Sequence, residues 1–318
     1  MNILIPQVLF DYYVPDARLI APSAGFIAYS DDETSPHGLA DVEAISWWYT
    51  VRHIDDIVCG APKLRWLHSG SAGVDRLLSP TIAARYDLTV TDSGPAFEVS
   101  ISEFVMAWIL SVARRLPELD AQQRGRVWNS VKQDEVYGKT VGIIGLGPIG
   151  RGVAARGKAF GMRTLGLRRT QAPVDAVDEV LTGHDGLMRL LAESDYVVIA
   201  AALTGETKAL IGREQLASMK STAWLINIAR GAMIDETALV DALRFGKFAG
   251  ACLDVFETEP LPHDSLLWEM PNVHIAPHNS GGMTDGVRER QKQLFLDNLG
   301  RFVNGDTLAD VVDVKRGY

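Results

Sequence analysis

One six-residue segment restricts the fold of this chain more than any other: Gly145-Leu146-Gly147-Pro148-Ile149-Gly150. It follows the apolar run 141–144 and opens a segment with helical character. Gly145 permits a tight turn, Gly147 lets a pyrophosphate approach the backbone, and Gly150 lets helix and strand pack closely. The helix N-terminus adds N–H donors and a positive dipole end. A glycine-rich loop without a ligand is the alternative, but the order strand, loop, helix favours a dinucleotide-binding unit.

The end of the next predicted strand bears on the choice of dinucleotide. Arg168, Arg169 and Thr170 lie there, about 18 to 20 residues after the glycine loop. NAD-binding units usually place Asp or Glu at this point, for the ribose 2′-OH. No acidic residue occurs between Met162 and Val174. Two arginines suit a 2′-phosphate, so the sequence predicts NADP as the preferred coenzyme, with NAD also usable; a solvated basic turn is the alternative.

Apolar runs alternate with helical segments along the chain, which is typical of parallel sheets with crossover helices. The sequence therefore predicts an α/β fold with one sheet before and one after a long helix near 101–112. The predicted strands are 2–5, 26–29, 44–48, 65–68 and 88–91, then 140–144, 163–167, 196–200, 224–228, 251–255 and 273–276. Ser100 or Ser102 is the expected N-cap of the long helix, Gly150 the expected start of the next, and Gly305 the expected end of the last.

Length and composition exclude several classes. The 318 residues predict two domains. The formal charge is −9 and no basic stripe occurs, so we expect no nucleic-acid partner. Cys59 and Cys252 lie far apart without metal-ligand spacing, which predicts no metal site and a reducing, cytoplasmic location. No basic residue precedes Arg18, and the longest apolar runs, such as 196–203, are much shorter than the roughly 20 residues that span a bilayer, so we expect no membrane partner.

Polar residues follow three predicted strands of the second region. Arg230 follows the run 225–229, Asp254 and Glu259 lie in the segment 251–260, and His278 follows 273–277. Open α/β sheets bind their ligands at the carboxyl ends of the strands. These side chains are therefore candidates for binding or chemistry.

From Arg65 almost to its end, the sequence resembles the D-isomer-specific 2-hydroxyacid dehydrogenases. Within this family it is most similar in character to the glyoxylate and hydroxypyruvate reductases. The motifs that carry this resemblance are Val74-Asp75 after a glycine, Ser102-Glu103, the loop 145–150, Ala229-Arg230-Gly231, Leu253-Asp254-Val255-Phe256, Glu259-Pro260, Pro277-His278 and Gly317-Tyr318. The resemblance implies that Arg230, Glu259 and His278 are the catalytic residues and that Asp254 contacts the nicotinamide amide. The full set of expected cofactor-binding residues is Gly145, Gly147, Pro148, Ile149, Gly150, Arg168, Arg169, Thr170, Ile228, Ala229, Arg230, Asp254 and His278.

The chemistry of such an enzyme explains the residue types. Reduction of a 2-oxo acid needs a hydride on C2 and a proton on the oxygen. We expect His278 to donate the proton, because imidazole titrates near neutral pH. Glu259, if hydrogen-bonded to His278, would orient the ring and favour its protonated form. Arg230 would bind the carboxylate and polarise the carbonyl, because a planar guanidinium fits a two-oxygen anion.

A turn after the strand 65–68 is the candidate second anchor for the substrate carboxylate. Its sequence is Ser69-Gly70-Ser71-Ala72-Gly73, and backbone N–H groups of such a turn can form an anion nest. The resemblance implies that Ser71, Ala72 and Gly73 bind the substrate, together with Arg230 and His278; a plain strand-to-helix loop is the alternative. Trp47, Trp48 and Tyr49 end an earlier strand, and they either wall the substrate pocket or belong to the core.

The resemblance also implies the domain plan. Residues 1–95 plus 284–318 would form a flavodoxin-like substrate-binding domain, and residues 96–283 a dinucleotide-binding Rossmann domain, each with a parallel sheet. A homodimer would form through the coenzyme domain, with the 101–112 helix and the arm after it as candidate contacts.

The expected activity is reduction of a small 2-oxo acid, of the glyoxylate or hydroxypyruvate type, to the D-2-hydroxy acid by hydride transfer from NAD(P)H. The alternatives are a formate or phosphite dehydrogenase of the same fold and a dinucleotide-sensing, corepressor-like binding protein. Glu259 disfavours the formate type, whose histidine pairs with glutamine, and the sequence has none of the long tails of the corepressors. Besides Arg168, the segments 202–204 and 279–282 depart from the family pattern.

Overall fold

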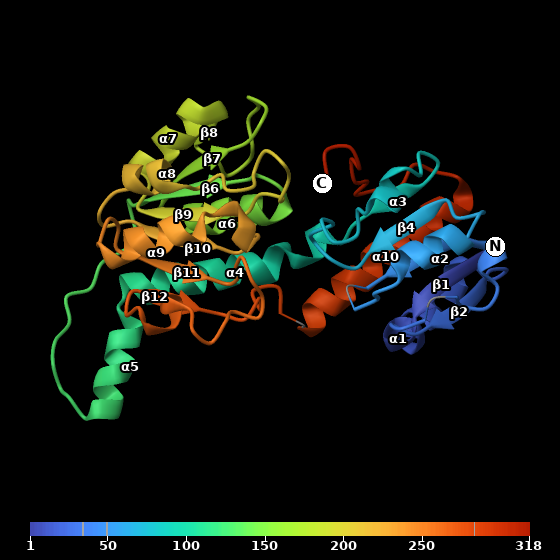
Figure 1. The fold of residues 1–318 in the computed structure, drawn as a ribbon, viewed down its shortest axis with the longest axis horizontal. Helices are drawn as coiled ribbons and strands as arrows, with labels where there is room; N and C mark the ends of the chain where they lie inside the picture. Colours follow the sequence, from blue (N-terminus) through green and yellow to red (C-terminus); the bar gives the residue numbers. More distant parts are fainter. Residues whose placement is uncertain (34, 49, 283) are drawn as a thin grey trace. The chain divides into compact units, whose positions relative to one another are not determined.

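The computed structural model describes residues 1–33, 35–48, 50–282 and 284–318, and within them the chain divides into two compact units (Figure 1). One unit comprises residues 1–97 and 283–318, and the other comprises residues 98–282. Helix α4 (Gly94–Ala113) carries the chain from the first unit to the second. Each unit has its own parallel sheet and its own buried apolar cluster, which confirms the predicted α/β class.

Among its described residues, the first unit contains a sheet of five parallel strands in the order β2-β1-β3-β4-β5. This order is that of flavodoxin-like sheets. The strands are β1 (Asn2–Pro6), β2 (Gly25–Tyr29), β3 (Val42–Trp47), β4 (Trp66–Ser69) and β5 (Thr89–Thr91). The helical elements are α1 (Gln7–Ile20), η1 (Leu39–Asp41), α2 (Ile54–Gly60), α3 (Pro80–Ala83) and α10 (Asp285–Asn304).

Helix α10 brings the last part of the chain back to the first unit. Thr284 caps its start by accepting from the Val287 amide, and Gly305, with φ of +76°, ends it as predicted. The helix packs beside α1. Its buried Phe295 stacks on Trp66 of β4, with ring centroids 5.4 Å apart. This packing fixes α10 against the sheet.

In the second unit, the part of the chain that the structure describes forms seven parallel strands in the order β12-β11-β10-β9-β6-β7-β8. The strands are β6 (Thr140–Ile144), β7 (Arg163–Leu167), β8 (Glu179–Leu181), β9 (Tyr196–Ile199), β10 (Trp224–Asn227), β11 (Gly250–Leu253) and β12 (Val273–Ile275). The helical elements besides α4 are α5 (Leu116–Gly125), α6 (Pro148–Ala159), α7 (Gly183–Glu193), α8 (Arg213–Ser218), η2 (Gly231–Met233), α9 (Glu236–Arg244) and η3 (Leu266–Glu269). The strand order changes direction between β6 and β9, where open sheets bind ligands.

Strand β8 and helix α5 are among the elements that were not predicted from the sequence. Strand β8 has three residues and begins with Glu179, so it is too short and too polar to be recognised as an apolar run. Helix α5 has no buried residue and therefore no apolar stripe. Figure 1 shows α5 extending away from the sheet of the second unit and the segment after it returning to that sheet.

The predicted starts of two helices were wrong. Helix α4 begins at Gly94, whose amide donates to the carboxylate of Asp92 at 2.7 Å. Ser100 and Ser102 lie inside this helix, and the Ser102 hydroxyl donates to the carbonyl of Glu98. A carboxylate before the helix satisfies the orphan N–H, so no serine cap is needed. Helix α6 begins at Pro148 rather than Gly150, because proline fits the first helical position.

Helix α4 is also long and apolar enough to cross a membrane, by length and composition only. Buried helices of globular proteins share this property. A search of the sequence for uninterrupted apolar runs does not find this helix, because Glu98 and Glu103 interrupt the sequence of α4. Its predicted stripe is divided: Ile101, Val105, Ile109 and Val112 are buried, whereas Phe104 and Trp108 stay partly exposed and contact each other edge-on.

The carboxylate before α4 makes the stability of the first unit depend on pH. Burial is the main cause that raises the pKa of Asp92 from 3.8 to about 6; the hydrogen bond from Gly94 opposes this rise, and the charge of Asp310 adds to it. The folded state therefore binds a proton more tightly than the unfolded chain between about pH 4 and pH 6. Stability contributed by this group is present below pH 4 and is lost as pH rises through about 6.

We predict that Asp92→Asn stabilises the protein at pH 8. The amide removes the buried charge and keeps an oxygen that accepts from Gly94, so the free energy of unfolding should rise by about 1–3 kcal/mol. Urea denaturation at pH 8 and at pH 4.5 measures the effect. The gain should be much smaller at pH 4.5, where Asp92 is mostly protonated. An equal gain at both pH values would contradict this account.

Candidate active site

The glycine loop after β6 has the geometry that a pyrophosphate requires. Gly145 has φ of +98°, and a Cβ on it would lie 2.6 Å from the backbone of Ala201. A Cβ on Gly150 would lie 1.9 Å from the carbonyl oxygen of Gly145. Beside Gly147, in contrast, a Cβ would meet no atom within 4 Å. Two glycines thus permit close packing, while the third leaves open backbone before the N-terminus of α6, so these residues fit a dinucleotide phosphate.

Arg168, Arg169 and Thr170 directly follow β7, as predicted. Arg168 is half-buried, and its amide donates to the carbonyl of Leu181 at 3.1 Å. Arg169 and Thr170 are exposed. The guanidinium of Arg169 forms an ion pair with Glu206 at 3.1 Å. The two arginines therefore differ, because a carboxylate already offsets the charge of Arg169.

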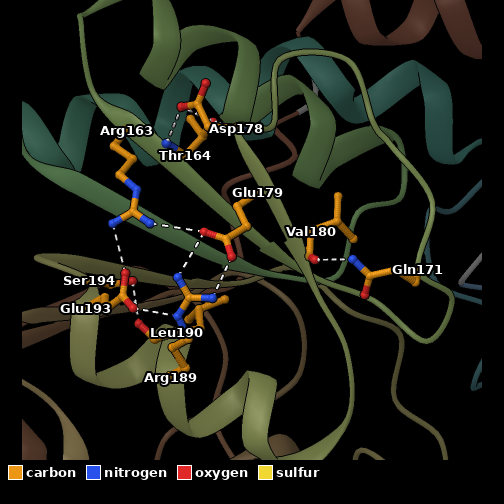
Figure 2. Close-up of polar contacts among 10 residues, drawn as sticks. All are labelled: Arg163, Thr164, Gln171, Asp178, Glu179, Val180, Arg189, Leu190, Glu193 and Ser194. Carbon is orange, nitrogen blue, oxygen red and sulfur yellow. Dashed lines mark hydrogen bonds and ion pairs between the residues drawn. The ribbon is translucent and has the colours of Figure 1, made fainter.

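Polar contacts at the edge strand β8 fix this end of the sheet (Figure 2). Arg163 and Arg189 both contact Glu179, and both also contact Glu193. The side-chain amide of Gln171 donates to the carbonyl of Val180 at 2.8 Å. Gln171 immediately follows Thr170, so this bond ties the loop with the two arginines to β8. Neither β8 nor Gln171 was singled out from the sequence, because both lie in a polar stretch without a motif.

Asn227, at the end of β10, shapes the loop that carries Arg230. Its side-chain oxygen accepts from the amide of Ala229 at 3.1 Å, and its side-chain nitrogen donates to the carbonyl of Arg230 at 3.0 Å. The guanidinium of Arg230 donates to the carbonyl of Ala229 at 2.7 Å. Gly231 lies so close to the next loop that a Cβ would be 1.8 Å from the carbonyl carbon of Phe256. The Arg230 loop therefore packs directly on the segment that leads to Glu259.

Glu259 and His278 form the predicted pair. Nδ1 of His278 lies 2.9 Å from one carboxylate oxygen of Glu259, and the other oxygen accepts from the amide of Phe256 at 3.2 Å. The side chains are 24% and 41% exposed, respectively, so both are reachable from solvent. The pair can orient the imidazole and hold a proton on its Nδ1, which leaves Nε2 for exchange with a ligand.

Asp254 has a role that the sequence did not indicate. It is fully buried, and its two carboxylate oxygens accept from the amides of Asn279 at 2.6 Å and Ser280 at 3.0 Å. The amide of His278 donates to the Asp254 carbonyl at 2.8 Å. His278 itself has φ of +52°, a region that non-glycine residues rarely adopt. These three hydrogen bonds hold the histidine in that conformation, and the nicotinamide contact of Asp254 stays a prediction.

The candidate substrate turn, Ser69–Gly73, follows β4 in the first unit. The amide of Gly70 donates to the carbonyl of Trp47 at 2.9 Å. A Cβ on Gly70 would lie 2.5 Å from a ring carbon of Trp48. Trp47 and Trp48 are buried members of the apolar core, and Tyr49 lies outside the described residues.

The second unit thus brings together the loops of Arg230, Glu259 and His278 and carries the glycine loop, all after strands of one sheet. Ser71, Ala72 and Gly73 belong to the first unit. Within the described ranges, no three His, Cys, Asp or Glu side chains are grouped to hold a metal ion.

Comparison with known proteins identifies the family of this chain. The sequence profile described as "D-isomer specific 2-hydroxyacid dehydrogenase, NAD binding domain" matches residues 106–280. A glyoxylate reductase of Thermococcus gammatolerans is 40% identical over 290 residues, which are 87% of this chain and 86% of the relative. The chain belongs to the D-isomer specific 2-hydroxyacid dehydrogenase family.

Solved structures of family members agree with this assignment. A D-isomer specific 2-hydroxyacid dehydrogenase of Xanthobacter autotrophicus, in complex with NADPH and MES, is 30% identical, has a TM-score of 0.87 and is matched over 100% of this chain and 99% of that one. An NADPH-dependent glyoxylate/hydroxypyruvate reductase of Sinorhizobium meliloti, in complex with NADP and sulfate, is 26% identical with a TM-score of 0.85, over 100% of this chain and 99% of that one. The prediction of an NAD(P)-dependent D-2-hydroxyacid dehydrogenase is confirmed.

Two substitutions separate the roles of the glycines in this dehydrogenase. We predict that Gly150→Ala lowers the free energy of unfolding by about 1–3 kcal/mol, because the new methyl group overpacks the Gly145 carbonyl. Gly147→Ala should change it by less than about 0.5 kcal/mol, yet weaken NADPH binding at least about tenfold, because the methyl group occupies open space at the phosphate loop. Urea denaturation without ligand and fluorescence titration with NADPH measure the two effects. Wild-type affinity for NADPH in Gly147→Ala would refute this interpretation.

Proposed function

We propose that this enzyme reduces a small 2-oxo acid of the glyoxylate or hydroxypyruvate type to the D-2-hydroxy acid, with NADPH as the preferred reductant. The observation that carries the proposal is the contact of 2.9 Å between His278 Nδ1 and Glu259, which leaves Nε2 as a proton donor. The names of the relatives, glyoxylate reductase and glyoxylate/hydroxypyruvate reductase, support the substrate class.

In the second unit, His278 and Glu259 serve the proton transfer, and Arg230 binds the negative charge of the substrate. Protonated His278 donates its Nε2 proton to the carbonyl oxygen as that oxygen becomes a hydroxyl. Glu259 stabilises the imidazolium before the transfer and keeps the ring aligned. Arg230 binds the substrate anion and draws electron density from the carbonyl, because a guanidinium offers several donors in one plane.

The two units have different proposed roles. Residues 1–95 with 284–318 bind the substrate carboxylate, through the turn of Ser71, Ala72 and Gly73. Residues 96–283 bind the coenzyme, whose reduced nicotinamide supplies the hydride when it is bound. Gly145, Gly147, Pro148, Ile149 and Gly150 hold the pyrophosphate. Ile228, Ala229 and Asp254 hold the nicotinamide end.

Arg168 is the proposed reason for a preference for NADPH. It is half-buried at the end of β7, where a carboxylate would otherwise accept the ribose 2′-OH. A guanidinium offers charge-assisted donors to a 2′-phosphate instead. Arg169 and Thr170 contribute at the rim of the same position. The ion pair with Glu206 makes the contribution of Arg169 the smaller one.

A homodimer through the second unit accounts for apolar surface on the arm after α4. Trp128 is fully exposed, Val127 and Leu116 are about half exposed, and α5 buries none of its residues. A second copy of the chain would cover these side chains, since contiguous exposed apolar surface usually marks an interface.

We also propose a cytoplasmic location, which suits two free cysteines. Burial raises the pKa of the Cys252 thiol and so keeps it unreactive.

An initial-rate panel tests the proposed function. Glyoxylate, hydroxypyruvate, pyruvate and phenylpyruvate are each assayed with NADPH and with NADH, by the loss of absorbance of the reduced coenzyme. We expect the highest kcat/KM with glyoxylate or hydroxypyruvate, and at least about tenfold preference for NADPH, since one charge-assisted contact contributes about 1.5–3 kcal/mol. No turnover with any of the four acids would contradict the proposal and favour a dinucleotide-sensing binding protein.

Arg168→Asp tests the assignment of the coenzyme preference. The carboxylate should repel a 2′-phosphate and accept the 2′-OH of NADH, so the NADPH to NADH ratio of kcat/KM should fall by at least about 100-fold. Arg169→Ala is the matched variant, and its effect should be smaller because Arg169 already pairs with Glu206. If Arg169→Ala changes the ratio more than Arg168→Asp, the roles of the two arginines are reversed.

Glu259→Gln tests the acid–base pair. Reduction needs a proton from His278, and the Glu259 carboxylate contacts the Nδ1 of this ring at 2.9 Å. The amide keeps the size of the side chain but removes the negative charge that stabilises the imidazolium, so kcat for reduction should fall at least about tenfold while the affinity for NADPH stays unchanged. Glu257→Gln removes a neighbouring exposed carboxylate and should leave kcat unchanged. Wild-type kcat in Glu259→Gln would exclude Glu259 as the partner of His278.

A further inference from the structure

Helix α10 places a buried amide side chain against the candidate substrate turn. Gln291 is 1% exposed, and its Nε2 donates to the carbonyl oxygen of Gly70 at 2.6 Å. Both residues belong to the first unit. Neighbouring buried positions of this helix, such as Val287 and Phe295, are apolar and serve the core. A buried polar group without a partner would destabilise the fold, so the bond to Gly70 is what makes Gln291 tolerable there.

The hydrogen bond of Gln291 completes the fixation of the Gly70 peptide. The carbonyl of Gly70 accepts from Gln291, and the amide of Ser71, in the same peptide plane, donates to Ser69 Oγ at 3.2 Å. The amide of Gly70 donates to the carbonyl of Trp47 at 2.9 Å. Trp48 lies directly against Gly70, with no room for a Cβ. The peptide group between Gly70 and Ser71 is therefore hydrogen-bonded at its carbonyl and at its amide, and the ring of Trp48 packs against Gly70.

The next peptide plane, which contains the Ala72 N–H, follows this fixed plane, and its carbonyl, that of Ser71, accepts from the amide of Ser93 at 3.2 Å. Within the part of the chain that the structure describes, the N–H groups of Ala72 and Gly73 donate to no protein acceptor. Ala72 and Gly73 are also only partly buried, so a ligand can reach them. Two successive N–H groups without protein acceptors are the donors that a carboxylate would use. Their direction depends on two successive peptide planes, the first held by Gln291 and the second by Ser93.

We propose that Gln291 is a positioning residue for the substrate: its buried amide holds the Gly70 carbonyl and, together with the bond from Ser93 to the next carbonyl, aims the N–H groups of Ala72 and Gly73 at the substrate carboxylate. This inference rests on the proposed function, because it needs a 2-oxo acid whose carboxylate binds the turn. Gln291 touches no reacting atom. Its loss should weaken binding of the carboxylate equally in the ground state and the transition state, which raises KM and leaves kcat nearly unchanged.

Gln291→Met tests the proposal, since methionine has a similar size and cannot donate to Gly70. We expect KM for glyoxylate, or for the best acid of the panel, to rise about three- to tenfold, with kcat within about twofold and KM for NADPH unchanged. The inhibition constant of oxamate, a carboxylate that is not reduced, should rise by the same factor. Gln291→Asn keeps an amide but is shorter by one methylene, and it is the second test if Gln291→Met does not fold. Its KM for the 2-oxo acid should also rise above that of the wild type, by a smaller factor.

Asn298→Leu is the matched control. Asn298 is an equally buried amide on α10, and it bonds the backbone of Ala309 at 3.0 Å and 2.8 Å rather than the turn. It should lower the melting temperature at least as much as Gln291→Met and leave KM for the 2-oxo acid unchanged. If the Gln291 variants lose stability but keep the KM and the oxamate constant of the wild type, Gln291 is only structural and the proposal is wrong. A wild-type enzyme that reduces no 2-oxo acid would instead overturn the proposed function, and this inference with it.

Discussion

The buried carboxylate of Asp254 is the interaction on which the geometry of the candidate active site depends. The two carboxylate oxygens accept from the amides of Asn279 and Ser280, and the backbone carbonyl of Asp254 accepts from the amide of His278. The chain after β12 is thereby held in a bend that places His278 at φ of +52° and its ring beside Glu259. An apolar residue at position 254 would leave the amides of Asn279 and Ser280 without their carboxylate partners, at a cost of about 1–3 kcal/mol for each one that stays buried.

Close backbone approach provides the second constraint. Gly231 lets the Arg230 loop lie on the Phe256 segment, and Gly145 with Gly150 lets the phosphate loop pack on its own helix and on the end of β9. In the first unit, Gly70 has the same role under Trp48. In each case a side chain would displace a loop that carries a functional group. The candidate sites of both units are therefore built from backbone packing, with one polar side chain, Asn227 or Gln291, bonding the loop.

Much of the fold could be predicted from periodicity. Strands buried on both faces appear as apolar runs, and the predicted strands of both sheets differ from β1–β7 and β9–β12 by at most two residues at each end. Strand β8 and helix α5 could not be predicted, because a three-residue edge strand and a helix without buried residues lack a periodic signal. The cap of α4 was placed too late because only Ser100 and Ser102 were considered, whereas the carboxylate that precedes the helix, by two residues, is that of Asp92. The three motifs that carry the candidate catalytic residues were found because polar residues follow an apolar run in each of them.

The α/β class, the dinucleotide loop, the family and the candidates Arg230, Glu259 and His278 could all be inferred from the sequence, because these depend on local order along the chain. The side chains that hold the candidate residues in place are apparent only in the folded protein. Asp254 bonds residues 25 and 26 positions away, and Gln291 bonds a carbonyl 221 positions away. Such contacts arise when parallel strands align their carboxyl ends and when α10 packs against the first sheet, and no local pattern records them. The separate behaviour of Arg168 and Arg169 has the same origin, since Glu206 comes from a different loop.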